Sequence, residues 1–271
     1  MPFGSELALT PGLSPFERAY IRVFGAPILG LRVRADRLLP LLSDIGTPRR
    51  IADAGCGRGV LTLAMARAFP RAEVIGLDLD EKQNRVNTEI VSALGVANAR
   101  FVTHDVQRIE TLGAFDAILT SDTLEHLADD LGCTRMFFRA LTPGGFLLAH
   151  VPHLTRNLFG WHRTNWMDIA GHVRPGYTRA SLIALLTRAG FQMIRCEYDY
   201  NSIQTLASDL SYWITGGHER NKMIYALAFP FLLALAAIGS SYRPCKDGSG
   251  LVALARKPLG WNANSTRPAP S

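Results

Sequence analysis

The feature that most constrains the fold is the short segment Ile51-Ala-Asp-Ala-Gly-Cys-Gly-Arg-Gly-Val60, in which three glycines separate a hydrophobic run from a helical one. Glycine adopts positive φ without strain and lets a ligand come close to the backbone. The free N–H groups at the start of a helix attract negative groups such as a carboxylate. The segment therefore predicts a ligand-binding turn between a β-strand and an α-helix.

Around this segment, residues 50–151 alternate β-rich runs with helical stretches. The expected strands are Arg50–Ala54, Glu73–Asp78, Arg100–Thr103, Phe115–Thr120 and Gly145–Val151. The expected helices are Val60–Phe69, Asp80–Leu94 and Asp130–Leu141. Such alternation predicts a doubly wound, Rossmann-like α/β fold in which helices cover a parallel sheet. Sheets of this kind bind ligands at the carboxyl ends of their strands.

The flanking sequence adds helices and two further strands to this core. Pro15–Ser43 reads as two helices broken around Gly25–Gly30, and a helix between Thr178 and Gly190 precedes two strands, Phe191–Tyr198 and Leu251–Arg256. Between the core and that helix, Pro152–Tyr177 has no periodic pattern and predicts a long functional loop. We expect five parts: a helical cap (1–45), a core (46–200), an apolar helical insertion (201–249), a last core strand (250–257) and a disordered tail (258–271).

Composition narrows the classes of function. Of the 271 residues 48% are hydrophobic and 19% charged, which excludes a disordered chain. Four separated cysteines without a CxxC pair argue against a zinc cluster or a disulfide framework and fit a reducing cytoplasm. No secretion signal is recognisable at the start. Residues 51–150 carry a net charge of −4 between basic flanks whose cations are scattered, which favours a membrane surface or an anionic substrate over nucleic acid.

Acidic residues at three expected strand ends indicate the ligand of the glycine turn. Asp53 disfavours a pyrophosphate and suits a ligand with an ammonium group, and Val60 departs from the dinucleotide fingerprint, so a nicotinamide oxidoreductase is a distant alternative. Asp78, followed by Leu79, can accept both hydroxyls of a ribose. Asp105 can accept from an adenine amino group with Val106 beside the ring, although Asp105 could equally be a solvated helix cap. The set suits an adenosine with an amino-acid tail. The cofactor-site candidates are Asp53, Gly55, Gly57, Gly59, Asp78, Leu79, Asp105 and Val106.

Five motifs in order resemble those of class I S-adenosylmethionine-dependent methyltransferases, over about residues 45–200 and a last strand at 250–257. They are Asp53-Ala-Gly-Cys-Gly-Arg-Gly59, Asp78, Asp105, Phe115-Asp-Ala-Ile-Leu119 and Leu141-Thr-Pro-Gly-Gly145. The resemblance implies a seven-stranded sheet with an antiparallel last strand, and S-adenosylmethionine as cofactor. Leu124-Glu-His126 is similar to small-molecule O-methyltransferases, including those of quinone biosynthesis. His172–Thr178 and Leu251–Lys257 resemble methyltransferases of bacterial envelope and glycan gene clusters.

Catalytic candidates follow the fourth and fifth expected strands. Methyl transfer needs in-line positioning and, for a hydroxyl acceptor, a general base. We expect His126 to be that base, oriented by Asp122, with His153 as a further candidate; a helix-terminal histidine satisfied by backbone is the structural alternative. The histidines of the long loop match no metal signature, so no metal is expected. O-methylation of a small or lipid-linked acceptor is the main hypothesis, and N-methylation or a noncatalytic cofactor-binding domain are the alternatives.

Residues 223–242 form an uncharged stretch of twenty residues, MIYALAFPFLLALAAIGSSY, with Arg220 and Lys222 before it and Arg243 and Lys246 after it. A single membrane crossing would separate the last strand from the sheet, and Pro230 should interrupt a helix. Two interpretations remain: a buried helix pair, or an apolar surface that dips into one leaflet. The second predicts a cytoplasmic protein at the inner membrane surface. Oligomeric state stays open.

Overall fold

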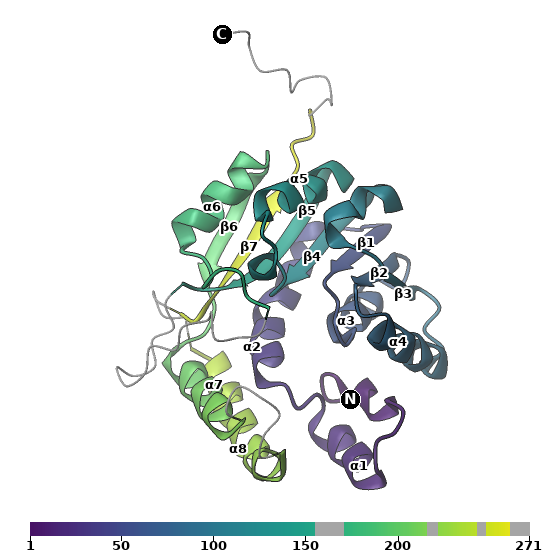
Figure 1. Cartoon of the computed structure of the whole chain (residues 1–271), viewed down its shortest axis with the longest axis vertical. Coiled ribbons are helices and arrows are strands. Elements are labelled where there is room, and N and C mark those ends of the chain that lie inside the picture. The colour runs from purple at the N-terminus through teal and green to yellow at the C-terminus, as the bar shows by residue number, and fades with distance from the viewer. Residues whose placement is uncertain (155–170, 216–221, 243–247, 261–271) are drawn as a thin grey trace.

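A single seven-stranded sheet forms the centre of the molecule in the computed structural model, which describes residues 1–154, 171–215, 222–242 and 248–260 (Figure 1). The strands are β1 (Arg50–Ala54), β2 (Glu73–Asp78), β3 (Ala99–Thr103), β4 (Phe115–Ser121), β5 (Leu141–Pro152), β6 (Gln192–Tyr198) and β7 (Gly250–Arg256). Their order is β3-β2-β1-β4-β5-β7-β6. Neighbours from β3 to β5 are parallel, whereas β7 is antiparallel to β5 and β6. The predicted fold class is confirmed.

Several of the α-helices begin at residues whose side chains cap them. They are α1 (Pro15–Phe24), α2 (Leu29–Leu38), α3 (Val60–Ala68), α4 (Glu81–Leu94), α5 (Asp130–Ala140), α6 (Arg179–Arg188), α7 (Ser202–Thr215) and α8 (Lys222–Ser240). Ser14 and Thr178 form capping boxes at α1 and α6, and Asp80 caps α4. The short 3-10 helices are η1 (Ser5–Leu9), η2 (Leu39–Ile45), η3 (Val106–Leu112) and η4 (Leu124–His126).

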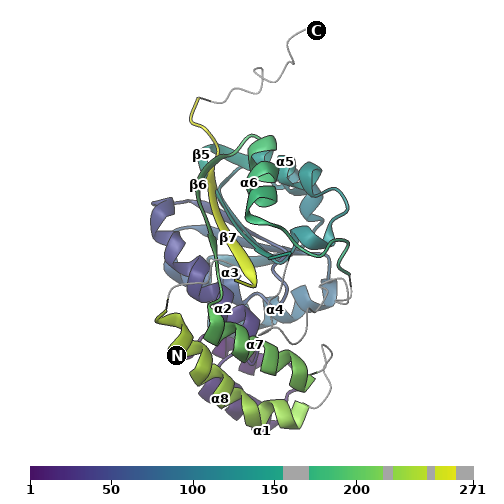
Figure 2. The same ribbon diagram turned by 90° about the vertical axis from the view of Figure 1, so that its left-hand side faces the viewer.

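Two layers of helices cover the sheet because alternate strand residues point to opposite faces. Ala52 and Ala54 of β1 belong to the cluster that packs against α5 and α6, whereas Ile51 belongs to the cluster that packs against α3, α4 and the N-terminal helical segments. Figure 2 shows α5 and α6 on one side of the sheet, seen close to its edge. Since β2 and β4 flank β1 on opposite sides, the connections diverge between β1 and β4, where doubly wound sheets bind ligands.

A third hydrophobic cluster joins α2 to α7 and α8. It lies at the end of the molecule away from the C-terminus of the chain (Figures 1 and 2). Phe229, Leu232 and Ala236 of α8 are buried there against Leu29 and Val33 of α2. The predicted helical insertion is thus present. Of the two interpretations left open for residues 223–242, a helix pair within the stretch is not formed, because α8 continues through Pro230 as one helix.

The reason for this continuity lies in a single hydrogen bond. A proline lacks the N–H that would donate to the carbonyl four residues earlier, which here belongs to Ala226. The Tyr20 hydroxyl of α1 donates to that carbonyl at 2.6 Å and so replaces the missing bond. The local sequence predicts that Pro230 interrupts the helix. Tyr20, which lies 206 positions before Ala226 in the chain, removes this conflict by satisfying the Ala226 carbonyl.

Most of the predicted loop Pro152–Tyr177 falls outside the described residues, including Trp161, His162 and Trp166. The predicted tail does so from residue 261 onward.

Candidate functional site

The glycine turn after β1 is held open by backbone hydrogen bonds to the end of β2. The N–H groups of Gly55 and Cys56 donate to the Leu77 carbonyl at 2.8 and 2.9 Å. Gly55, Gly57 and Gly59 all have positive φ, of 82°, 47° and 72°. The turn therefore uses the freedom of glycine at each of the three predicted positions.

The surroundings of these glycines differ: Gly55 and Gly59 are closely packed, whereas Gly57 leaves space for a ligand. A Cβ on Gly55 would lie 2.2 Å from Thr123 Oγ1, and one on Gly59 would lie 2.5 Å from the Phe101 ring. A Cβ on Gly57 would meet nothing within 4 Å. Gly57 therefore faces open space at the sheet edge, as a backbone cradle for a ligand requires.

The Asp78 carboxylate lies at the end of β2 and supports the turn. Its Oδ2 accepts from the Gly57 N–H at 2.9 Å and its Oδ1 accepts from the Asp80 N–H at 3.0 Å. The next residue, Leu79, is 70% exposed beside it. Each carboxylate oxygen retains a lone pair for a further donor, so the ribose-binding prediction for Asp78 is sterically open.

Asp105 and Val106 follow β3 and start a short helix. Asp105 Oδ1 accepts from the Gln107 N–H at 2.9 Å, so this carboxylate does cap η3. Val106 is buried against the core beneath it. The cap occupies one oxygen of Asp105, and the proposed adenine contact remains a prediction for the other.

Asp53 lies under the turn rather than on its open side. Its side chain is 1% exposed, and Thr62 Oγ1 donates to Asp53 Oδ2 at 2.6 Å. Burial raises the pKa of Asp53 to about 7. Any effect of this carboxylate on a cationic ligand would therefore be exerted from beneath the turn.

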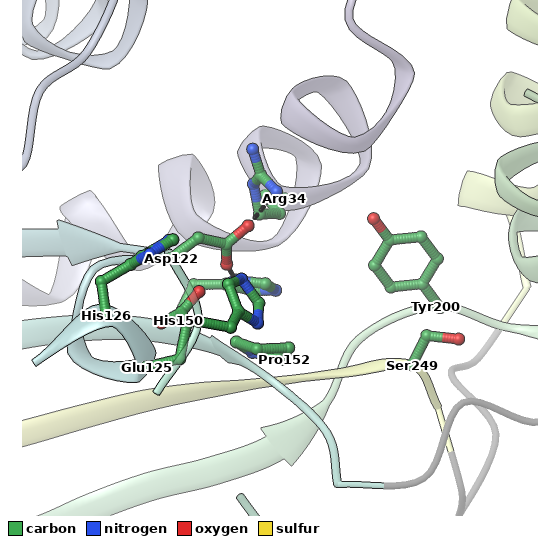
Figure 3. A pocket seen from close by; sticks show the side chains of 9 residues that line it. Arg34, Asp122, Glu125, His126, His150, Pro152, Tyr200 and Ser249 are labelled. Carbon is green, nitrogen blue, oxygen red and sulfur yellow. Dashed lines mark hydrogen bonds and ion pairs between the residues drawn. The ribbon is translucent and has the colours of Figure 1, made fainter. Parts of the chain in front are cut away.

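A cavity of about 260 Å³ opens next to the turn, where β4 and β5 end (Figure 3). Thr123, whose Oγ1 donates to the Ala54 carbonyl at 3.1 Å, connects the glycine turn to this cavity. The lining residues come from α2, β5, the segments after β4 and β6, and the segments before α6 and β7: Arg34, Asp122, Glu125, His126, His150, Pro152, His172, Tyr200 and Ser249.

A chain of charged side chains forms one wall of the cavity. His150 is buried between two carboxylates, with Nδ1 2.5 Å from Asp122 Oδ1 and Nε2 2.6 Å from Asp199 Oδ2. Arg34 forms an ion pair with the other oxygen of Asp122, drawn as a dashed line in Figure 3. Two cations thus alternate with two carboxylates, which satisfies charges that burial would otherwise penalise.

The pKa values in this wall follow from that alternation. Burial alone would lower the pKa of His150, but Asp122 and Asp199 outweigh it and raise the pKa to about 9. Burial alone would raise the pKa of Asp122, but Arg34 and His150 outweigh it and lower the pKa. His150 is therefore an imidazolium whose N–H groups are both engaged, which makes it a structural cation and not a base.

The prediction that Asp122 orients His126 was wrong. Both Asp122 oxygens are engaged by Arg34 and His150, because Asp122 turns toward β5, where its N–H donates to the His150 carbonyl at 3.0 Å. Asp122 also has a positive φ of 51°, a conformation it shares with Tyr200 alone among the described non-glycine residues. Both line the cavity, and local strain of this kind is typical of functional sites.

His126 is exposed at the cavity and meets His172 edge to face, with ring centroids 4.6 Å apart. Among the described residues no hydrogen bond reaches either ring nitrogen of His126, so the alternative of a backbone-satisfied histidine lacks support. Burial and the neighbouring His126 lower the pKa of His172. His153 does not line the cavity; its ring packs edge-on against Tyr198, with centroids 5.3 Å apart.

Glu125 is the unexpected side chain of the site. It is 0% exposed, and neither carboxylate oxygen has a hydrogen-bond partner within the part of the chain that the structure describes. Burial first, and then the charge of Asp122, raise the pKa of Glu125 to about 8. Ligand atoms of Glu125, His126 and His172 lie within 4.8 Å of one another, so this trio could hold a metal ion, and the expectation of a metal-free site stays a prediction.

Sequence reasoning missed Arg34, His150, Asp199, Tyr200 and Ser249, which come from elements far apart in the chain. Of these, a polar His150 within the apolar run Phe146–Val151 was the one local signal.

Comparisons with known proteins agree with this geometry. A family model described as a methyltransferase domain matches residues 30–195. Trans-aconitate 2-methyltransferase of Acidovorax ebreus is 26% identical over 267 residues, covering 85% of this chain and 95% of the relative. The ubiquinone biosynthesis O-methyltransferase of Idiomarina loihiensis is 27% identical, covering 52% of this chain and 60% of the relative. Among solved structures, Haemonchus contortus phosphoethanolamine N-methyltransferase 2 with S-adenosyl-L-methionine shares the fold, with a TM-score of 0.57, 18% identity, and coverage of 91% of this chain and 61% of that one.

Proposed function

We propose, from the premise that this chain belongs to the class I S-adenosylmethionine-dependent methyltransferases, that it methylates an oxygen atom of a small or lipid-linked acceptor. The enzyme class and the cofactor follow from the family, which sets aside the noncatalytic alternative. The acceptor and its reacting atom are the proposal. One observation carries it: a cavity is lined by the exposed imidazole of His126, on a segment that Thr123 ties to the strand end before the glycine turn.

The turn suits the cofactor because it combines three positive-φ glycines with open space above Gly57. We assign the amino-acid end of the cofactor to Gly55, Gly57 and Gly59, with Asp53 beneath them as a favourable charge. We assign the ribose hydroxyls to Asp78 beside Leu79, and the adenine to Asp105 and Val106. When bound, S-adenosylmethionine supplies the methyl group as an activated electrophile.

His126 takes the proton that the acceptor hydroxyl loses as its oxygen gains the methyl group. Its exposure at the cavity supports this role, as does the absence of a hydrogen bond to its ring nitrogens from any described residue. A base of this kind contributes about 10²–10⁴-fold to a rate. Asp122 is a positioning residue: anchored by Arg34 and His150, it fixes the start of the segment that carries Glu125 and His126.

The ubiquinone biosynthesis O-methyltransferase among the relatives supports oxygen as the reacting atom. N-methylation is the second candidate, and one observation favours it. The buried, unpartnered carboxyl of Glu125 could pair with an ammonium group of an acceptor.

Incubation with methyl-labelled S-adenosylmethionine and cell extract, split into lipid and polar fractions, tests the proposal. NMR of the labelled product then separates O-methyl from N-methyl groups. An O-methyl product supports the proposal, and an N-methyl product gives the role to the second candidate. Transfer of label to no fraction would contradict both.

We also propose that the reaction takes place in the cytoplasm, with residues 223–242 at the inner membrane surface. Free thiols at Cys56, Cys133 and Cys196 support a reducing compartment.

A further inference from the structure

Helix α8 is apolar on two opposite sides, although only one of them is buried. Its inner side packs in the cluster of α2, α7 and α8. On its outer side Leu227 is 81% and Phe231 65% exposed. Three further apolar side chains at helical spacing extend this stripe along the helix: Met223, Ile224 and Ile238. By length and composition α8 could span a membrane, but a single exposed stripe indicates a different contact.

Both ends of α8 are tied to the same body, which argues against a crossing. Near its start, Tyr20 of α1 holds the Ala226 carbonyl and the Tyr225 hydroxyl donates to the Pro27 carbonyl at 3.2 Å. Near its end, the Ser240 hydroxyl donates to Asp36 at 2.6 Å. An apolar helix held flat against a domain by its inner side can enter only the surface of a leaflet.

The charge of this segment fits an anionic surface. From Arg220 to Lys246 the sequence carries four basic residues and no acidic one. Among the described acidic groups near α8, Glu17 feels the charge of Lys222, Asp36 accepts from Ser240, and Asp209 belongs to α7, which packs along α8. Lys222, at the start of α8, would meet anionic headgroups there, and the sequence has further cations beyond both ends of the helix.

The stripe is also connected to the catalytic cavity. Tyr200 belongs to the cluster behind α8 and lines the cavity. In α2, Val33 packs in that cluster while the adjacent Arg34 lines the cavity.

We propose that α8 docks flat on an anionic bilayer leaflet through the stripe of Met223, Ile224, Leu227, Phe231 and Ile238. In this arrangement the α2–α8 cluster, through Tyr200, connects the docked helix to the cavity that would receive a lipid-linked acceptor. This last step rests on the proposed function, whereas the docking itself does not.

Flotation of the full chain with vesicles tests the docking without any acceptor. Vesicles of phosphatidylcholine with phosphatidylglycerol should bind the protein, more weakly at high salt, and vesicles of phosphatidylcholine alone should bind less. Leu227→Ser with Phe231→Ser should lower the partition coefficient at least about tenfold, because two apolar side chains leave the leaflet. Lys222→Gln should weaken binding to the anionic vesicles alone.

Ile194→Ser is the matched control, since Ile194 is also exposed but lies on β6. It should bind vesicles like the unchanged chain. Thermal melting and cofactor binding check that each variant is folded. If the double variant does not fold, the vesicle binding of the single variant Leu227→Ser tests the docking instead. Failure of the unchanged chain to float with anionic vesicles would overturn the docking. So would light scattering that shows a dimer dissolved by Leu227→Ser, because the stripe would then belong to a second copy.

Discussion

At the scale of single residues, the cavity contains two kinds of polar side chain: those fixed by hydrogen bonds and ion pairs, and one that is available to react with an acceptor. Both ring nitrogens of His150 and both carboxylate oxygens of Asp122 are engaged by partners, so these two side chains are fixed. His126 has no such partner among the described residues. A general base needs a free ring nitrogen. We therefore expect His126 to transfer the proton, and Asp122 and His150 to hold the surrounding segment in place.

The His126→Ala variant should keep its affinity for S-adenosylmethionine and lose about 10²–10⁴-fold in turnover. Calorimetry with S-adenosylmethionine and steady-state kinetics with the labelled acceptor measure the two quantities. Turnover within a few-fold of the unchanged enzyme would instead give the role to His172, which touches His126, or to His153.

Replacing Asp78 by Ala should weaken cofactor binding by on the order of 1.5–3 kcal/mol, because a charged hydrogen-bond acceptor is removed. Asp78 also holds the Gly57 N–H, so Asp78→Asn serves as the control that keeps one acceptor oxygen. Calorimetry should show the highest cofactor affinity for the unchanged chain, a lower affinity for the Asn variant and the lowest for the Ala variant. Equal affinities for all three would contradict the ribose assignment.

At the scale of elements, the β1–α3 turn combines two uses of glycine. Gly59→Ala should destabilise the fold, since its Cβ would press on the Phe101 ring. Gly57→Ala should cost only about 1 kcal/mol of stability for its positive φ, yet weaken cofactor binding strongly, because its Cβ points into open ligand space. Urea unfolding and calorimetry on both variants measure the difference. Unchanged cofactor affinity in Gly57→Ala would exclude a ligand from that space.

The α1–α8 contact makes a second prediction at this scale. Tyr20→Phe should lower the free energy of unfolding by about 1 kcal/mol, because the Ala226 carbonyl loses its donor. In that background Pro230→Ala should restore stability, because alanine supplies the N–H that proline lacks. A double-mutant cycle by urea unfolding measures the coupling. Additive effects would mean that the Tyr20 hydroxyl does not compensate for Pro230.

At the scale of the whole molecule, three buried groups set the pH dependence of stability. The folded state raises the pKa of Asp53 from 3.8 to about 7, of Glu125 from 4.5 to about 8, and of His150 from 6.5 to about 9. A group whose folded pKa is raised stabilises below its ordinary pKa and loses that contribution as pH rises through the folded value. Asp122, with a lowered pKa, acts oppositely and loses its contribution in acid.

Urea unfolding should therefore show the highest stability in mild acid and a decline up to about pH 9, to which His150 contributes. The buried thiols of Cys56 and Cys133, whose pKa values are also raised, add to the loss at its alkaline end. His150→Asn should make the decline between about pH 7 and 9 smaller. It should also lower stability near pH 6 by about 3–5 kcal/mol, because Asp122 and Asp199 lose their shared cation. An alkaline decline that persists unchanged in the variant would contradict the charged wall.

The sequence by itself determined the sheet and the glycine turn, because both depend on local information. Strand and helix periods, the capping residues and the positions of Gly55, Gly57 and Gly59 act over a few residues, so β1 and β2 match their predicted bounds. The same holds for Asp78, since a residue at a parallel strand end must lie at the binding edge of the sheet.

Only the tertiary structure decided the partners of each side chain. Asp122 could have faced His126 or His150, and the strand pairing of β4 with β5 selected His150. Arg34 lines the cavity from a segment that precedes β1, and Asp199, which follows β6, binds His150 from behind the cavity. Pro230 remains helical because Tyr20 is folded against it, and α8 keeps one apolar side exposed because α2 and α7 cover only the other. Such contacts depend on chain segments brought together by the whole fold, which no local pattern in the sequence encodes.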